Sequence, residues 1–135
     1  MREDLPRTVA RLKALNVPKI VLLGPPPGWQ AGLPTTVLNY YQQTGAVLPI
    51  RTFYGSTDEW VRGRDALLAS LSRELDIQYV SVRNVFCNEE GCLTRIGPDA
   101  SQLTAFDAGH LTVPASIYLA GHVLDDILGA KPLAR

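Results

Sequence analysis

Residues 20–28, with the sequence IVLLGPPPG, give the clearest indication of the fold. Four consecutive apolar residues are typical of a strand that is buried in a parallel sheet, and the glycines and prolines after them end the strand abruptly. Before the strand, apolar residues repeat at helical spacing from Leu5 to Leu15, with Asp4 as the expected N-cap of a first helix. A helix that leads into a buried strand is the first half of an α/β pattern.

Helices and strands continue to alternate along the rest of the chain. The stretch 29–57 is expected to be irregular, with a short helix at 35–42. A helix is predicted to start at Thr57 or Asp58, and a second strand is predicted at 77–82. The return arm of a hairpin is predicted at 93–96. A last helix is predicted from Val113 or Pro114 to about Leu128, where Gly129 ends it.

The fold predicted from this order is α/β, with parallel strands and helices on both faces. A doubly wound sheet usually has about five or six strands, and only two core strands are predicted here. We therefore expect a single domain, 1–135, that is a partial three-layer αβα sheet of the flavodoxin-like kind and lacks its N-terminal strands.

Composition excludes several classes of function. The chain of 135 residues has 13 Lys+Arg and 13 Asp+Glu, and this neutral balance gives no electrostatic basis for binding nucleic acid. No apolar run reaches the roughly 20 residues of a membrane span, and the N-terminus lacks the apolar core of a secretion signal. If the protein works outside the cytoplasm, the signal was removed or belongs to a larger parent chain. No cofactor is expected.

Two cysteines, Cys87 and Cys92, enclose the short polar run NEEG. With only two histidines in the chain and no second cysteine pair, a zinc site has little support. Two readings remain open from the spacing alone: two free thiols, or a local disulfide across a tight turn in an oxidising compartment.

The stretch DAGHL, residues 107–111, contains the best candidates for catalysis, Asp107 and His110. On a tight turn that contains a glycine, an aspartate can hold one nitrogen of a histidine three residues later, which leaves the other nitrogen to act as a general base. The alternative is an exposed loop histidine near a turn aspartate. The other histidine, His122, is explained by contacts with Asp125 or Asp126 on the surface of the last helix.

No recognised serine nucleophile accompanies this pair. The closest match, Ser56, lacks the strand before it that a nucleophile turn needs, and its expected role is to cap the helix that follows. Four aromatic residues could line a cleft that binds carbohydrate, or they could pack in the core and anchor loops: Trp29, Tyr40, Tyr41 and Trp60.

Together, the strand exit VLLGPPP, the cysteine turn CNEEGC and the block FDAGHLT resemble the C-terminal half of an SGNH (GDSL-type) hydrolase domain. The nearest subgroup is the domain fused to the membrane part of bacterial O-acyltransferases that modify cell-surface polysaccharides. The resemblance runs from about Leu5 to Leu128. The Gly-Asp-Ser block with the nucleophile, and the blocks that complete the oxyanion hole, have no counterpart here.

The resemblance implies a role for each matching residue. Asp107 and His110 are the Asp and His of a Ser-His-Asp triad in an O-acyltransferase or esterase that acts on acetyl groups of a surface glycan. Cys87 and Cys92 form a disulfide in a periplasmic protein. The implied partners are an N-terminal SGNH segment or the membrane acyltransferase domain, and homo-oligomers are a further expectation. The alternative function is a non-catalytic SGNH-like module that binds a glycan or a partner.

Overall fold

The computed structural model describes residues 4–129 and shows a mixed α/β fold with two small sheets. One sheet is a parallel pair, β1 (Val21–Leu23) and β3 (Gln78–Val80), with Leu22 opposite Tyr79. The other sheet is antiparallel, in the order β2 (Arg51–Thr52), β5 (Gly91–Leu93) and β4 (Cys87–Asn88). The two predicted parallel strands are thus confirmed.

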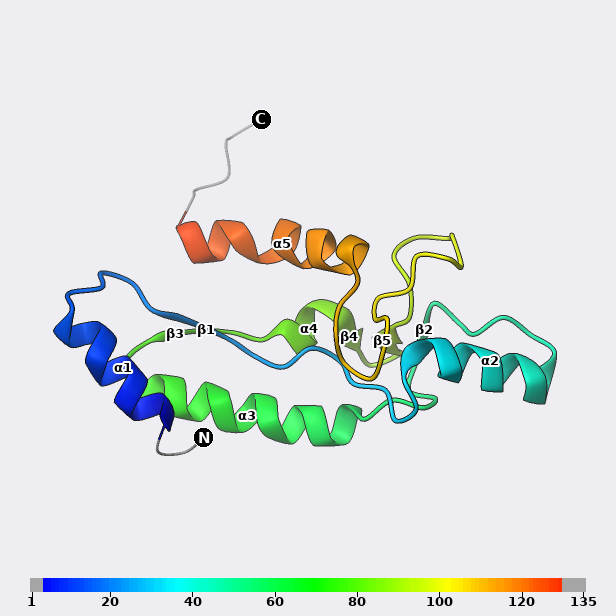
Figure 1. The fold of residues 1–135 in the computed structure, drawn as a ribbon, viewed down its shortest axis with the longest axis horizontal. Coiled ribbons are helices and arrows are strands. Elements are labelled where there is room, and N and C mark those ends of the chain that lie inside the picture. The colour runs from blue at the N-terminus through cyan, green and yellow to red at the C-terminus, as the bar shows by residue number, and fades with distance from the viewer. Residues whose placement is uncertain (1–3, 130–135) are drawn as a thin grey trace.

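Helices lie on both sides of the parallel pair (Figure 1). In that view α1 (Asp4–Ala14) and α3 (Asp58–Glu74) lie below the strands, and α5 (Val113–Leu128) lies above them. The helix α2 (Leu33–Thr44) and the short α4 (Val82–Phe86) lie toward the antiparallel sheet. None of the helices in this part of the chain has the length and apolar character that a membrane span needs.

Several predicted boundaries are confirmed by the way the helices begin and end. The Thr112 hydroxyl accepts a hydrogen bond from the Ala115 N–H at the start of α5, and Gly129 takes the left-handed conformation at its end. At the start of α3, the Ser56 hydroxyl accepts a hydrogen bond from the Asp58 N–H, as the helix-capping interpretation predicted. Asp4, expected to be an N-cap, lies instead in the first turn of α1.

Two sequence-based expectations differ from the structure. The stretch 29–57 is more ordered than predicted, because it contains the whole of α2 and the strand β2. The strand after α1 is less buried than its apolar run suggested: Val21 and Leu22 are half-buried, and the Leu23 side chain is 46% exposed. This exposure follows from the pairing, since β1 has a strand on only one edge within residues 4–129.

The largest apolar cluster lies away from the parallel pair. It joins the start of α2, the cysteine hairpin and the start of α5, and its buried members include Trp29, Leu33, Phe86, Ala105 and Ala115. The segments on either side of residues 107–110 therefore rest on one packed core, which holds the loop between them in place.

The cysteine hairpin contains a disulfide between Cys87 and Cys92, as the family resemblance implied. These residues lie opposite each other in the β4–β5 register. Gly91, at the start of β5, has a φ of 134°, and a Cβ there would lie 2.5 Å from the backbone of Thr52. Only glycine allows β2 and the hairpin to approach this closely.

Candidate active site

The two ends of the loop that carries Asp107 and His110 are joined to each other by backbone pairing. Ala105 and Leu111 form an antiparallel bridge, and the Phe106 N–H donates to the His110 carbonyl over 3.2 Å. The loop is therefore a narrow turn between the core residue Ala105 and the start of α5. Because α5 begins directly after this turn, the helix and the loop have fixed relative positions.

The Asp107 carboxylate organises this turn. Its Oδ1 accepts hydrogen bonds from the backbone N–H groups of Gly109, at 2.9 Å, and His110, at 2.8 Å. These two backbone donors, together with the His110 ring, lower the pKa of Asp107 to about 2. Asp107 is therefore a carboxylate throughout the physiological pH range.

The second oxygen of Asp107, Oδ2, lies 2.7 Å from Nδ1 of His110. A carboxylate can only accept a hydrogen bond, so Nδ1 must carry the proton in this contact. In the neutral imidazole the lone pair then lies on Nε2, which has no hydrogen-bond partner within residues 4–129. The structure thus brings the predicted pair together, with the His110 side chain 78% exposed.

Two backbone contacts fix the turn to the rest of the domain. The Trp29 N–H donates to the Ala108 carbonyl at 2.8 Å, and the Leu33 N–H donates to the Asp107 carbonyl at 3.1 Å. Trp29 and Leu33 are themselves buried. Of the two roles considered for Trp29, the structure supports core packing and loop anchoring, because only 1% of the residue is exposed.

Phe106 is a site residue to which the sequence analysis assigned no role. Its ring stacks against the His110 imidazole, with ring centroids 5.7 Å apart and planes at 16°. The stacked ring and the Asp107 hydrogen bond together restrict the orientation of the imidazole. The only sequence signal for this contact is an aromatic residue four positions before the histidine, and that spacing predicts nothing outside a helix.

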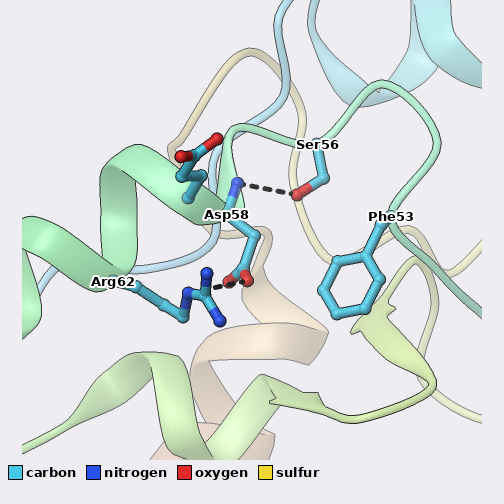
Figure 2. A pocket seen from close by; sticks show the side chains of 5 residues that line it. Phe53, Ser56, Asp58 and Arg62 are labelled. Atoms are coloured by element: carbon cyan, nitrogen blue, oxygen red, sulfur yellow. Dashed lines mark hydrogen bonds and ion pairs between the residues drawn. The ribbon is translucent and has the colours of Figure 1, made fainter.

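Ser56 lies in a separate pocket of about 300 Å³, which is also lined by Phe53, Asp58 and Arg62 (Figure 2). The dashed line from Ser56 in Figure 2 marks its contact with the Asp58 N–H, which is the helix-capping contact described above. No hydrogen bond joins Ser56 to His110 in this part of the chain. The structure therefore gives Ser56 a capping contact and no base to activate it.

His122 and the two cysteines do not join the Asp107–His110 turn. His122 turns back to the Tyr118 carbonyl, with Nδ1 2.8 Å from the oxygen, and does not contact Asp125 or Asp126 as predicted. Cys87 and Cys92 lie near Asp58, but a disulfide has no thiolate to offer a metal ion.

A mixed α/β fold with an aspartate–histidine pair on the loop before its last helix is an arrangement found in hydrolase-type α/β domains. Comparison with known proteins gives the family. The chain belongs to the family described as the SGNH domain fused to AT3 domains, which residues 1–125 match. This confirms the family that the sequence motifs resemble.

A solved structure is similar over most of the chain. It is the periplasmic domain of a lipopolysaccharide acetyltransferase from Salmonella ser. Paratyphi A, with 32% sequence identity and a TM-score of 0.85. The alignment covers 92% of this chain and 48% of that one, so this chain spans about half the length of the solved domain. No curated protein is similar enough to count as a match.

Proposed function

We propose that this chain forms the C-terminal half of an SGNH O-acyltransferase domain and supplies Asp107 and His110 to a Ser-His-Asp triad. The contact between Asp107 Oδ2 and His110 Nδ1 is the observation that carries the proposal, because it leaves Nε2 free to take a proton. Family membership adds that domains of this kind are fused to a membrane acyltransferase part.

The proposed reaction has two steps, in which His110 is first a base and then an acid. A serine on the N-terminal half of the domain attacks the acyl carbonyl, and its proton moves to His110 Nε2. The tetrahedral intermediate then collapses to an acyl-serine, and His110 passes the proton to the oxygen of the departing acyl donor. Asp107 holds the imidazole and stabilises its positive charge throughout.

The second step transfers the acyl group to a glycan. A sugar hydroxyl gives its proton to His110 Nε2 and attacks the acyl-serine, and the serine recovers the proton as it leaves. Oxyanion donors are also required, and we assign them to the N-terminal half, as the family motifs imply. Lipopolysaccharide is named for the solved relative, and a surface polysaccharide is our proposal for the acceptor here.

Two exposed apolar features indicate where the N-terminal half packs. The free edge of β1 includes Leu23, and one face of α5 exposes four apolar side chains between 46% and 73%: Val113, Ile117, Leu124 and Leu128. These positions are spaced by four, seven and four residues, so they form one stripe along the helix. We assign both features to contact with the N-terminal half, which completes the three-layer sheet.

The proposed location is the periplasm, in a membrane-anchored parent protein. The disulfide between Cys87 and Cys92 fits an oxidising compartment, and the solved relative is a periplasmic domain. Both observations agree with an acceptor glycan on the cell surface.

A reconstitution experiment tests the proposal. The 135-residue chain alone should not hydrolyse an acetyl ester measurably, because a base without a nucleophile has nothing to activate. Mixing it with the part of the solved Salmonella domain outside the aligned 48%, which we take to be its N-terminal half, should restore turnover. In that mixture Asp107→Asn should lower kcat by a factor on the order of 10² to 10⁴, because the imidazole loses the group that holds its tautomer. Turnover by the isolated chain would contradict the proposal.

A further inference from the structure

A pocket of about 580 Å³ lies directly beside the Asp107–His110 turn. Its walls come from the β1 exit, the first turn of α3 and the turn itself, and six of its lining residues are Pro25, Pro26, Trp60, Val61, Ala108 and Gly109. Ala108 and Gly109 are the two residues between Asp107 and His110. A molecule in this pocket, which we call the Trp60 pocket, would therefore contact the turn that carries the proposed general base, although neither Asp107 nor His110 lines the pocket.

Trp60 is unusual among the large apolar residues of α3 because it is 60% exposed. The sequence left two roles open for Trp60, lining a cleft or packing in the core, and the structure leaves most of the residue uncovered. The Arg64 guanidinium lies 4.6 Å from the indole ring, but Arg64 does not line the pocket. Arg64 thus lies over one face of the indole ring.

Trp60 also lines a second hollow, together with polar side chains. A neighbouring hollow of about 390 Å³ shares Gln30, Thr57 and Trp60 with the Trp60 pocket and adds Ser56 and Glu59. An indole ring flanked by an amide, two hydroxyls and a carboxylate matches a sugar ring, which has a face of C–H groups and an edge of hydroxyls. An acyl chain would satisfy only the apolar half of this surface.

The charge of the lining selects among sugars. No lysine or arginine lines either hollow, and Glu59 is the one charged lining residue. Within the lining, a uronic acid or a phosphorylated sugar would therefore meet the Glu59 carboxylate, with Arg64 on the indole ring outside the lining, whereas a neutral sugar can donate its hydroxyl protons to Glu59.

We propose that the Trp60 pocket binds one neutral sugar ring of the acceptor glycan, with the Trp60 indole stacked on the ring and Gln30 and Glu59 bonded to its hydroxyls. This inference rests on the proposed function, because it places the acceptor beside His110. Trp60 itself touches no reacting atom, and its role is to bind and position the acceptor.

The test is a binding measurement on the full 135-residue chain, which does not depend on turnover. The methyl glycosides of glucose, galactose, mannose and rhamnose are titrated while the NMR signal of the Trp60 indole N–H is followed, with Trp60→Phe used to assign it. At least one glycoside should shift this signal and show saturation transfer from the protein. Methyl glucuronide, which differs from methyl glucoside by a carboxylate at C6, should bind more weakly than the glucoside.

Substitutions identify the residues responsible. Trp60→Ala should raise the dissociation constant by roughly fivefold to tenfold, and Trp60→Phe should recover part of the loss, because a smaller ring still stacks. Tyr41→Ala is the matched control, since Tyr41 is a similarly exposed aromatic residue, at 58%, that lines neither hollow. It should leave binding unchanged.

Three outcomes would overturn the inference. The first is that none of the four glycosides shifts the indole signal. The second is that ethyl butyrate shifts it and the glycosides do not, which would make the pocket an acyl site. The third is that acrylamide no longer quenches Trp60 fluorescence once the N-terminal half is bound, which would make the pocket part of that interface. Sugar binding without any reconstituted turnover would instead contradict the proposed function and leave this inference standing.

Discussion

Asp107 acts on three groups at once, because its two oxygens accept hydrogen bonds from the Gly109 and His110 backbones and from the His110 ring. The backbone bonds shape the turn, and the ring contact sets the tautomer. One side chain therefore shapes the turn and fixes the tautomer of His110. Because all of these contacts lie within one turn, an aspartate three residues before a histidine could be recognised as a candidate pair without a structure.

The pKa of Asp107 provides a direct check on this turn. Its depressed value, about 2, means that the charged form is favoured in the folded loop. The resulting stabilisation is fully present above the ordinary aspartate pKa of about 3.9 and is lost as the pH falls through about 2. An NMR titration of the Asp107 carboxyl carbon should show this low midpoint. A midpoint near the ordinary value would mean that the turn is not formed in solution.

Sequence reasoning succeeded at this scale only where contacts are local. Asp107 and His110 are three residues apart on one turn, so spacing alone brought them together. The anchors Trp29 and Leu33 lie more than 70 residues away in the sequence, and nothing in their neighbourhoods indicates which loop they hold. The sequence could not decide between cleft lining and core packing for Trp60, because its exposure depends on neighbours that the helical pattern does not specify.

Among the secondary structure elements, α3 and α4 are joined by a buried ion pair. Arg83 contacts Asp58 through two hydrogen bonds, Nε to Oδ1 at 2.7 Å and Nη2 to Oδ2 at 2.9 Å, and the two side chains are only 14% and 10% exposed. The hydrogen bonds to Asp58 raise the pKa of Arg83 above its ordinary value. Asp58 also lies against the disulfide, with Oδ1 3.8 Å from Cys92 Sγ, so the pair ties the start of α3 to the cysteine hairpin.

Breaking this pair should destabilise the domain strongly. Arg83→Met leaves the buried Asp58 carboxylate without its bidentate partner, and the expected loss in the free energy of unfolding is about 3–5 kcal/mol by urea denaturation. Arg62→Met is the matched control. Arg62 also faces Asp58, at 3.8 Å, but its side chain is 62% exposed, so its loss should cost roughly 0–1 kcal/mol. Equal effects of the two substitutions would show that burial does not determine the strength of this pair.

Element types were predictable where apolar spacing and end signals agree. The last helix, from Val113 to Leu128 with Thr112 before it and Gly129 after it, matches its prediction. The strand β2 was missed because two residues, Arg51 and Thr52, form a strand only by pairing with β5, about 40 positions later. Such pairing has no local signal in the sequence.

At the scale of the whole molecule, residues 4–129 contain a small buried core and a parallel sheet of two strands. The core around Phe86 and the disulfide is buried, whereas β1 has a free edge within residues 4–129 and α5 has an uncovered apolar stripe. The shortage of strands was visible in the sequence. The apolar run at 20–23 is typical of a core strand. In the structure, however, this strand pairs on one edge only, with β3.

These surfaces predict self-association of the isolated chain. Free strand edges and exposed apolar stripes favour pairing with another molecule, so sedimentation of the purified chain should show dimers or larger species. Placing a charge on each surface, with Leu23→Lys and Leu124→Glu, should shift the population toward monomer. Glu89→Lys, in the exposed turn of the cysteine hairpin, is the control and should leave the proportion of monomer unchanged. A strictly monomeric wild-type chain at high concentration would contradict this reading of both surfaces.

The role of His110 is the central claim, and one rate comparison tests it most directly. Residues 4–129 are fused behind the N-terminal half of the solved Salmonella domain, and acetyl-ester turnover is compared with and without His110→Ala, with circular dichroism confirming that both fusions fold. We predict turnover by the first fusion and a loss on the order of 10³-fold or more in the second, because the serine then has no base. Equal turnover by the two folded fusions would show that His110 is not the base of the triad.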